Sequence, residues 1–415
     1  MDSGTITRRV DLDPPVPEEY ADELSARVFF VSPAIVGFSL VRSGSAIHAV
    51  DLRLSEDGAN DADGKDSANG KDGADGLERK LRFVVANDVL AQRRPEPKVI
   101  WRGRDVPAPR PGVYDVLLER GVAVETGEGQ VALAEPVLTL MDRLDARVRD
   151  LVVREFGARE YRYPTLLPTA VLGRCGYYRS FPQLMMFVSR LHEDVDDYRA
   201  FLDDLSDGRK LTEALRGHSG DPDLSLPPTM CLYTYHQFAD GPLDASAPVV
   251  TSRGKSFRFE SRYRRSLERL WDFTIRETVF LGPRDVVLER RRRLMERAFA
   301  LMDELDLGGR CEVANDPFFV DAATAQRAWS QQMLELKYEL RLPVADGRDV
   351  SVASFNFHDT FFAGSFGIAP AGPDDGAVHT ACAGFGLERL AYAFVCRHGP
   401  DPAAWPGGLG EGLTP

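Results

Sequence analysis

The sequence predicts an α+β fold in which an antiparallel sheet is flanked by helices, and three observations lead to it. Apolar residues recur at helical spacing from Leu133 to Val152, which indicates one long amphipathic helix. Two runs between residues 257 and 281 suit antiparallel strands, and a glycine-rich passage over Cys382–Leu390 suits a strand that turns into a helix. The 415 residues exceed the about 100–200 of a usual domain, so we expect one large core plus an appendage.

Composition narrows the class of protein. The apolar fraction of 43% is ordinary for a folded chain, and 51 basic against 64 acidic residues give a formal net charge of −13. That balance weighs against a broad surface for nucleic-acid phosphates. No apolar run approaches the about 20 residues that span a bilayer, and no secretory signal opens the chain. Five cysteines, an odd and sparse number, favour a reducing cytoplasm over a disulfide framework.

Residues 1–132 are expected to form a small N-terminal α/β unit. The apolar, β-branched stretches Arg27–Val36, Ala46–Leu54 and Lys80–Val89 are interpreted as its strands. Between them, residues 56–76 contain no large apolar side chain, which predicts a disordered acidic loop. The spacing of its aspartates does not fit a calcium-binding loop, because no glutamate closes the required frame.

The large core is expected over residues 133–400, with an insertion at 191–226 and a flexible tail at 401–415. Its first helix should end near Gly157, since glycine favours helix termination. A second helix is predicted from Pro283 to Leu305.

The most informative segment contains Arg258 and Glu260 on one predicted strand and Phe273, Ile275 and Glu277 on the next. Residues two apart on a strand point to the same face. If the two faces coincide, a cation, two carboxylates and an aromatic ring converge on one place. Such a group suits a nucleotide, because arginine binds phosphate oxygens and the ring can stack on the base.

Three segments, taken in order, resemble the motifs of the class II aminoacyl-tRNA synthetases. Gly157–Leu167 after the long helix resembles motif 1, Phe257–Glu260 with Arg269–Phe273 resembles motif 2, and Gly384–Arg389 resembles motif 3. The chain looks most like the archaeal-type seryl-tRNA synthetases and their truncated relatives, the amino acid:[carrier protein] ligases, from Leu133 to His398. Further segments that match the family are Leu226–Cys231, Asn315–Phe318, Leu336–Pro343 and Ala353–His358.

The resemblance implies an ATP site and assigns residues to it. Arg258 is expected to hold the α-phosphate and Arg389 the γ-phosphate, while Phe273 stacks on adenine. The remaining residues that the resemblance places around ATP and Mg²⁺ are Glu260, Arg269, Leu270, Glu339, Ser354 and Asn356. Positioning and charge neutralisation would supply most of the rate, without a proton-transferring base.

The resemblance also implies a zinc site made of Cys231, Glu277 and Cys382, which would bind the amino group of the substrate. Two thiolates and a carboxylate suit Zn²⁺ and leave its fourth position open. Cys175 is the chief rival ligand, and His379 is a further candidate. The other two cysteines, Cys311 and Cys396, are expected to be core residues.

The acceptor of the activated amino acid is the remaining question. Residues 1–132 show no long heptad pattern and no basic stripe, which argues against tRNA and for the phosphopantetheine thiol of a carrier protein. The run Arg290–Arg293, with Arg297, is either a solvated helix face or a docking surface for an acidic carrier. We expect a homodimer that activates glycine or alanine. An atypical seryl-tRNA synthetase and a catalytically inactive paralogue with a binding role remain alternatives.

Overall fold

The computed structural model describes residues 5–55, 74–90, 98–191, 194–243, 247–259, 266–314, 335–372 and 376–413. Three features predicted from the sequence lie outside these ranges: Glu260, the segment Asn315–Phe318 and most of the acidic stretch 56–76. Among the described residues, no helix has the length and apolar character needed to cross a bilayer.

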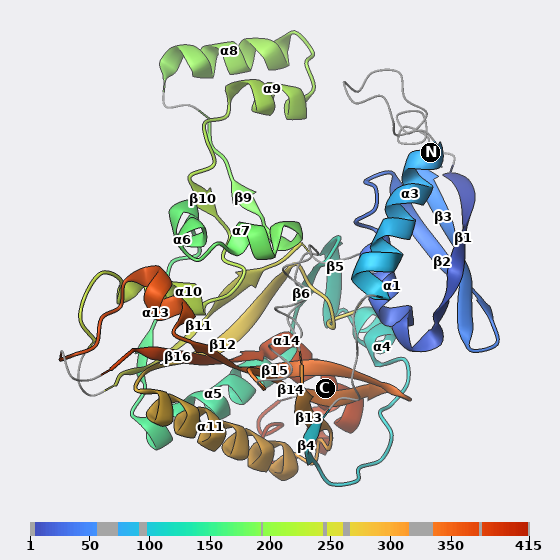
Figure 1. Cartoon of the computed structure of the whole chain (residues 1–415). Coiled ribbons are helices and arrows are strands. Elements are labelled where there is room, and N and C mark those ends of the chain that lie inside the picture. The colour runs from blue at the N-terminus through green and yellow to red at the C-terminus, as the bar shows by residue number, and fades with distance from the viewer. Residues whose placement is uncertain are drawn as a thin grey trace.

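An eight-stranded sheet forms the centre of the described structure (Figure 1). Its strands, in spatial order, are β4 (Val99–Arg102), β13 (Arg310–Val313), β14 (Lys337–Ala345), β15 (Arg348–Asp359), β16 (His379–Gly386), β12 (Asp272–Gly282), β11 (Val249–Phe257) and β7 (Arg159–Tyr161). All neighbours are antiparallel except β11 and β7, which run parallel. The predicted α+β class is therefore confirmed.

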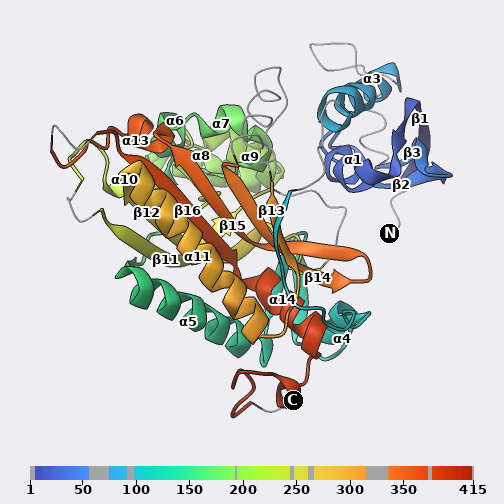
Figure 2. The same cartoon turned by 60° about the horizontal axis from the view of Figure 1, so that its bottom comes forward.

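Three long helices cover one face of this sheet (Figure 2). They are α5 (Val137–Phe156), α11 (Arg284–Glu304) and α14 (Leu387–His398). Apolar side chains from all three helices and from the strands form one large core. Helix α5 ends where predicted, because Gly157 adopts the left-handed conformation (φ 61°) in which glycine carries no steric penalty.

The opposite face of the sheet carries a second, smaller core and shorter helices. These are α6 (Thr169–Arg174), α7 (Tyr177–Ser180), the 3₁₀ turn Pro182–Leu184, α10 (Cys231–Gln237) and α13 (Phe361–Phe366). Ile275, Val279 and Leu281 of β12 point into this core, whereas Phe280 points into the larger one. The alternation along β12 thus assigns its odd-numbered residues to the face that holds the candidate site.

The N-terminal residues form a unit with its own core. Strands β1 (Thr5–Pro17), β3 (Ala46–Ser55) and β2 (Ile35–Ser43) make an antiparallel sheet, on which pack α1 (Ala21–Val28) and α3 (Ala74–Val84). The 3₁₀ turn Glu18–Tyr20 precedes α1, and a π-helical turn, Val85–Val89, continues α3.

Two of the strands predicted in this unit are wrong. The stretch 27–36 contains the end of α1 and the start of β2, and the stretch 80–89 is helical throughout. Short apolar, β-branched runs fit a buried helix face as well as a strand, and here tertiary packing favours the helix.

The break between the two cores lies earlier in the chain than the expected boundary at residue 132. Strand β4 is already an edge strand of the large sheet. After it come α4 (Val113–Glu119), β5 (Ala123–Gly127) and β6 (Gln130–Leu133), whose buried side chains belong to the large core. Residues 98–132 therefore pack with the large core and not with the N-terminal sheet.

Residues 401–413 do not extend from the core as a tail. After the 3₁₀ turn Pro402–Ala404, the side chains of Trp405 and Leu409 are buried in the large core. The guanidinium of Arg143 on α5 donates hydrogen bonds to the carbonyl oxygens of Leu409 (2.8 Å) and Glu411 (2.7 Å). Apolar burial and these bonds hold the segment on α5.

The predicted insertion is a helical hairpin on a narrow base (Figure 1). Strands β8 (Leu167–Pro168), β10 (Leu224–Ser225) and β9 (Phe187–Val188) form a small sheet, and α8 (Val195–Ser206) and α9 (Leu211–His218) stand beyond it. Residues Val195, Tyr198 and Leu202 of α8 are exposed.

Candidate active site

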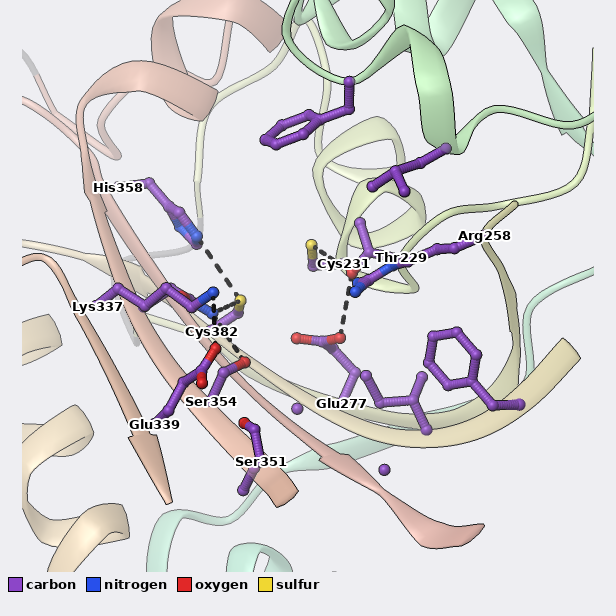
Figure 3. Close-up of a pocket in the computed structure, with 18 of the residues that line it drawn as sticks. Thr229, Cys231, Arg258, Glu277, Lys337, Glu339, Ser351, Ser354, His358 and Cys382 are labelled. Carbon is purple, nitrogen blue, oxygen red and sulfur yellow. Dashed lines mark hydrogen bonds and ion pairs between the residues drawn. The ribbon is translucent and has the colours of Figure 1, made fainter. Parts of the chain in front are cut away.

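A cavity of about 480 Å³ lies on the face of the sheet that carries the smaller core, over β12, β14, β15 and β16 (Figure 3). At one end, which we call the thiol end, it is lined by Cys231, Glu277 and Cys382. Arg258 and Arg389 line a further part of the wall, which we call the arginine end, and Arg258 is close enough to Glu277 that its charge acts to lower the pKa of that carboxyl. Residues that the sequence placed in three separate motifs therefore share one cavity.

The thiol end contains a compact group of three ligand-type side chains. One donor atom each from Cys231, Glu277 and Cys382 lies within 4.8 Å of the others, and all three residues are buried. Strand pairing explains two of them: Glu277 is opposite Gly384 and Cys382 opposite Val279, so Glu277 and Cys382 lie diagonally on one face. Cys231 reaches the same place from the first turn of α10.

Gly384 of the third motif makes room for this group. A Cβ at that position would lie 2.7 Å from the Ile275 side chain and 3.3 Å from Oε2 of Glu277. The glycine on β16 thus lets the two neighbouring side chains of β12 occupy the cavity wall. The sequence had indicated only a close approach between strand and helix.

Electrostatics at the thiol end favour a bound cation. Burial raises the pKa of Glu277 to about 7, against its ordinary value of 4.5. The pKa of the Cys382 thiol lies well above its ordinary value because it is hydrogen-bonded to Cys231, is buried and faces the Glu277 carboxylate. The Thr229 hydroxyl is 3.4 Å from both Cys231 Sγ and Glu277 Oε2. Two sulfur donors and a carboxylate in an apolar setting match the ligands that Zn²⁺ prefers.

The rival ligands lie outside this group. Cys175 lines the cavity, but its thiol is hydrogen-bonded to the backbone carbonyl oxygens of Val171 and Leu172, and burial raises its pKa to about 11. His379 is 3.1 Å from the Asp359 carboxylate and 3.0 Å from the Ala377 carbonyl oxygen. Cys311 and Cys396 are fully buried in the large core, as expected.

At the arginine end, Arg258 is held in place by two contacts. Its Nε donates to the Pro228 carbonyl oxygen (2.9 Å), and its guanidinium lies 5.4 Å from the centre of the Phe273 ring. Both residues line the cavity, together with Leu270. The Phe273 ring and the Arg258 guanidinium are thus adjacent. This arrangement suits a nucleotide, whose base can stack on the ring while its phosphate is bound by the cation.

Arg389 lies in the first turn of α14 and reaches the same cavity. Its Nε donates to the Glu268 carbonyl oxygen (2.7 Å) and a terminal nitrogen donates to that of Ser351 (3.2 Å). The preceding residue, Glu388, is buried, and its carboxylate accepts the backbone N–H of Thr274 at 2.8 Å. That bond ties the start of α14 to β12 and fixes where Arg389 points.

Glu339, Ser354 and Asn356 also line the cavity, from the neighbouring strands β14 and β15. The Glu339 carboxylate is 3.1 Å from Lys337 Nζ and 3.0 Å from the Arg341 guanidinium. Burial acts to raise the pKa of Glu339, but these cations outweigh it and lower the pKa, so the carboxylate is ionised. A half-buried anion beside two hydroxyl- or amide-bearing side chains is a suitable environment for Mg²⁺.

Several residues that line the cavity had no assigned role from the sequence, and one residue assigned to the ATP site does not line it. Lys337, His358 and Thr229 line it, although each had appeared only inside a longer family-like segment. Alternation from Ser354 and Asn356 to His358 along one strand could have identified the histidine. Arg269 is half-buried and is not among the described residues that line the cavity.

The basic run on α11 is largely engaged within the chain. Arg290 donates to the Ala247 carbonyl oxygen, and Arg291 to those of Glu335 and Leu336. Further along, Arg292 pairs with Glu289 and Glu296, and Arg293 and Arg297 both pair with Glu155. These partners account for the run without a docked protein.

No protein-family model matches the chain. It is 35% identical over 284 residues to amino acid–[acyl-carrier-protein] ligase 2 of Bradyrhizobium diazoefficiens, a match that covers 67% of this chain and 80% of that protein. The chain belongs to the amino acid–[acyl-carrier-protein] ligase family. To ligase 1 of the same organism it is 34% identical over 281 residues, covering 67% of this chain and 83% of that protein.

This ligase is also similar to seryl-tRNA synthetases. It is 28% identical over 292 residues to the type-2 serine–tRNA ligase of Methanococcus aeolicus, which covers 68% of this chain and 55% of that protein. Among solved structures, the M. kandleri seryl-tRNA synthetase in complex with A. aeolicus tRNASec has a TM-score of 0.66 at 21% identity, covering 98% of this chain and 77% of that one. The serine–tRNA ligase of Naegleria fowleri has a TM-score of 0.56 at 12% identity, covering 82% and 72%. These structures show the class II synthetase fold.

Proposed function

We propose that this ligase uses ATP to activate a small amino acid as its aminoacyl-adenylate and transfers the aminoacyl group to the phosphopantetheine thiol of a carrier protein. The observation that carries the proposal is one cavity lined both by a buried Cys231–Glu277–Cys382 group and by Arg258 and Arg389. The relatives named as [acyl-carrier-protein] ligases support the acceptor.

In the first half-reaction a carboxylate oxygen of the amino acid attacks the α-phosphorus of ATP. The new P–O bond forms as the bond to the bridging oxygen breaks, and diphosphate leaves. Arg258 would hold the α-phosphate beside Phe273, which would stack on adenine, and Arg389 would hold the terminal phosphate. Placement of these groups and neutralisation of phosphate charge would supply most of the rate.

Two metals fit this scheme. Cys231, Glu277 and Cys382 would hold Zn²⁺, which when bound offers an open coordination position to a neutral amine. Glu339, Ser354 and Asn356 would line the pocket for ATP and Mg²⁺. With the amino group at the thiol end, the carboxylate of the substrate would be within reach of Arg258, which lines the same cavity.

In the second half-reaction the pantetheine sulfur attacks the carbonyl carbon of the adenylate. The C–S bond forms, the bond from that carbon to the AMP oxygen breaks, and the thiol proton passes to solvent. We propose glycine or alanine as the amino acid, because the aromatic side chains of Phe361 and Phe362 and the imidazole of His358 also line this cavity.

We further propose a homodimer. In class II synthetases motif 1 usually builds the dimer interface, and its counterparts here are α5 and β7. Strand β7 is an outer strand of the described sheet, with β11 as its neighbour on one side. Light scattering tests the assembly, and a monomer at micromolar concentration would contradict it.

Incubation of the purified ligase with each amino acid, ATP and radiolabelled diphosphate tests activation. We expect ATP–diphosphate exchange with one or two small amino acids, and labelled amino acid on the phosphopantetheinylated carrier but not on its apo form. Exchange with no amino acid would favour the inactive paralogue. Labelling of tRNA in place of the carrier would overturn the proposed acceptor.

The second candidate is a seryl-tRNA synthetase-like activity. It is favoured by the structural match to the M. kandleri synthetase, which covers 98% of this chain. The match therefore extends over the N-terminal unit as well as the large core. The formal net charge of −13 weighs against it, since tRNA binding requires basic surface. The same labelling experiment separates the two acceptors.

A further inference from the structure

His358 lies at an irregularity in the sheet, next to the thiol end of the cavity. Between β15 and β16, Phe357 pairs with Ala381 and Asp359 with Thr380, so His358 is an extra residue in β15. Such a bulge redirects side chains and is frequent beside active sites. Here Ser354, Asn356 and His358 keep the ordinary alternation toward the cavity, and Phe357 also lines it although its ring packs in the large core.

The bulge is held in an unfavourable backbone conformation. Asp359, directly after His358, has a φ of 52°, in the left-handed region that non-glycine residues seldom adopt. Residues in such regions cluster at functional sites, where surrounding structure maintains them. The bulge therefore needs an explanation beyond strand pairing.

The imidazole of His358 contacts one of the candidate metal ligands. Its Nε2 is 3.7 Å from Cys382 Sγ, within hydrogen-bond distance for sulfur. Its Nδ1 is 3.3 Å from the Tyr235 hydroxyl and 3.4 Å from the Thr380 hydroxyl, and both of those residues are fully buried. His358 itself is not in the group of three donors within 4.8 Å.

These contacts select one arrangement of protons. A thiolate can only accept a hydrogen bond, so a histidine that serves a metal-bound Cys382 carries its proton on Nε2. Nδ1 then accepts from the hydroxyls of Tyr235 and Thr380. Asn356 Nδ2, 3.5 Å away, is a second donor to the same sulfur.

We propose that His358 is a positioning residue of the metal centre, whose Nε2–H donates to the Cys382 thiolate and, with Asn356, fixes its orientation and reduces its negative charge. A sulfur that donates less charge leaves the cation a stronger acceptor for the amino group of the substrate. This inference rests on the proposed function, because it requires metal at Cys231, Glu277 and Cys382.

The test compares His358→Leu, which removes the donor, with His358→Gln, whose side-chain amide can place an N–H close to the position of Nε2. The matched control is His236→Gln, an exposed histidine on α10, the helix that carries Cys231. Three quantities are measured: zinc affinity by competition with a chromogenic chelator, the charge-transfer absorption of the Co²⁺-loaded protein, and KM for amino acid and ATP in diphosphate exchange.

We expect His358→Leu to bind zinc about 10–100-fold more weakly, the range seen when the outer partner of a metal ligand is lost. Its KM for the amino acid should rise while that for ATP stays constant, and its sulfur-to-cobalt band should shift without losing intensity. His358→Gln should recover most of the affinity, and His236→Gln should match the parent. If His358→Leu does not fold, Tyr235→Phe combined with Thr380→Val tests the same point, because Nδ1 then loses both donors.

Wild-type zinc affinity and amino acid KM in His358→Leu would overturn the inference. A cobalt spectrum with a changed ligand number would also overturn it, since His358 would then be a ligand. A parent protein that holds no zinc would instead refute the metal site on which the inference rests. The two failures are therefore distinguishable.

Discussion

Arg276 and Glu277 are neighbours on β12, both are buried and charged, and they point to opposite faces of the sheet. Arg276, with no exposed surface, donates two hydrogen bonds of 2.7 Å to Asp145 of α5 and one of 2.9 Å to Glu160 of β7. Glu277, 2% exposed, faces the cavity, where the nearby Arg258 charge and hydrogen bonds from Cys382 and Thr229 act to lower its pKa but burial outweighs them.

The difference separates a structural charge from one available to a ligand. A buried charge is costly unless it is paired, and the Arg276 network provides that pairing within the chain. Burial instead raises the pKa of Glu277 to about 7, so the ionised carboxylate lowers the stability of the folded protein. Sites that await a ligand commonly reduce stability in this way, and their substitution can stabilise the protein.

The largest expected effect is a loss of activity on substitution of Glu277 or of Cys231, its neighbour at the thiol end. Cys231→Ala and Glu277→Gln should each lose the zinc, present at about one per chain in the parent. Diphosphate exchange should fall by more than the about 10–100-fold that loss of an outer partner costs. Elemental analysis and exchange assays measure both. Cys175→Ser is the control and should keep its zinc; zinc loss there would make Cys175 the ligand.

On the paired side, Asp145→Ala should destabilise the fold by about 3–5 kcal/mol, because it leaves the Arg276 guanidinium buried with one partner fewer. Denaturant unfolding measures this. Asp142→Ala is the matched control: that carboxylate is 55% exposed and pairs with Arg253 at 2.7 Å, so its loss should cost less than about 1 kcal/mol. Equal costs for the two variants would contradict a structural role for the buried pair.

The metal-free protein should become less stable as pH rises from 4.5 to 7. Native Glu277, with a pKa of about 7 against the ordinary 4.5, binds its proton more tightly than the unfolded chain does. The penalty is absent at low pH, is fully present above pH 7 and amounts to about 3 kcal/mol. Unfolding of chelator-treated protein at pH 5 and pH 8 checks this. Glu277→Gln should lose that part of the slope, and an unchanged slope would refute the burial cost.

The smallest effect is expected for Glu160→Gln, at about 1.5 kcal/mol, since the amide keeps one acceptor for Arg276 and Arg149. Burial acts to raise the pKa of Glu160, but hydrogen bonds from the two arginines outweigh it and lower the pKa. Its contribution is therefore present above pH 4.5 and is lost as the pH falls. Acid unfolding curves of parent and variant should converge at low pH, and parallel curves would contradict this assignment.

Much of the catalytic core could be predicted from the sequence because its signals are local. The helix 137–156 has an apolar face at helical spacing and a glycine at its end, and β12 alternates along its length. Alternation alone put Phe273, Ile275 and Glu277 on one face, and all three line the cavity. Cys231 and Cys382, about 150 positions apart, were grouped only by family resemblance, and the structure brings them together.

Local patterns failed where a long-range partner decides the outcome. The apolar stretch 80–89 fits a strand or a buried helix face, and packing on the N-terminal sheet selects the helix. In the run Arg290–Arg293, the first two arginines bind carbonyl oxygens of distant segments, which no local pattern indicated, while Arg292 and Arg293 remain exposed as a solvated helix face would be. The sequence around Trp405 and Leu409 was predicted to be a flexible tail. In the structure both side chains are buried in the large core, and Arg143 of α5 binds the Leu409 carbonyl oxygen.

By itself, therefore, the sequence determined the α+β class, the positions of the three motifs and which faces of their strands bear chemistry, because periodicity and turn residues act over a few positions. Only the tertiary structure decided where the N-terminal core ends, which buried charges are paired, and that the imidazole of His358 lies 3.7 Å from the Cys382 thiol. Those features depend on register and on contacts between segments far apart in the chain, which no local pattern encodes.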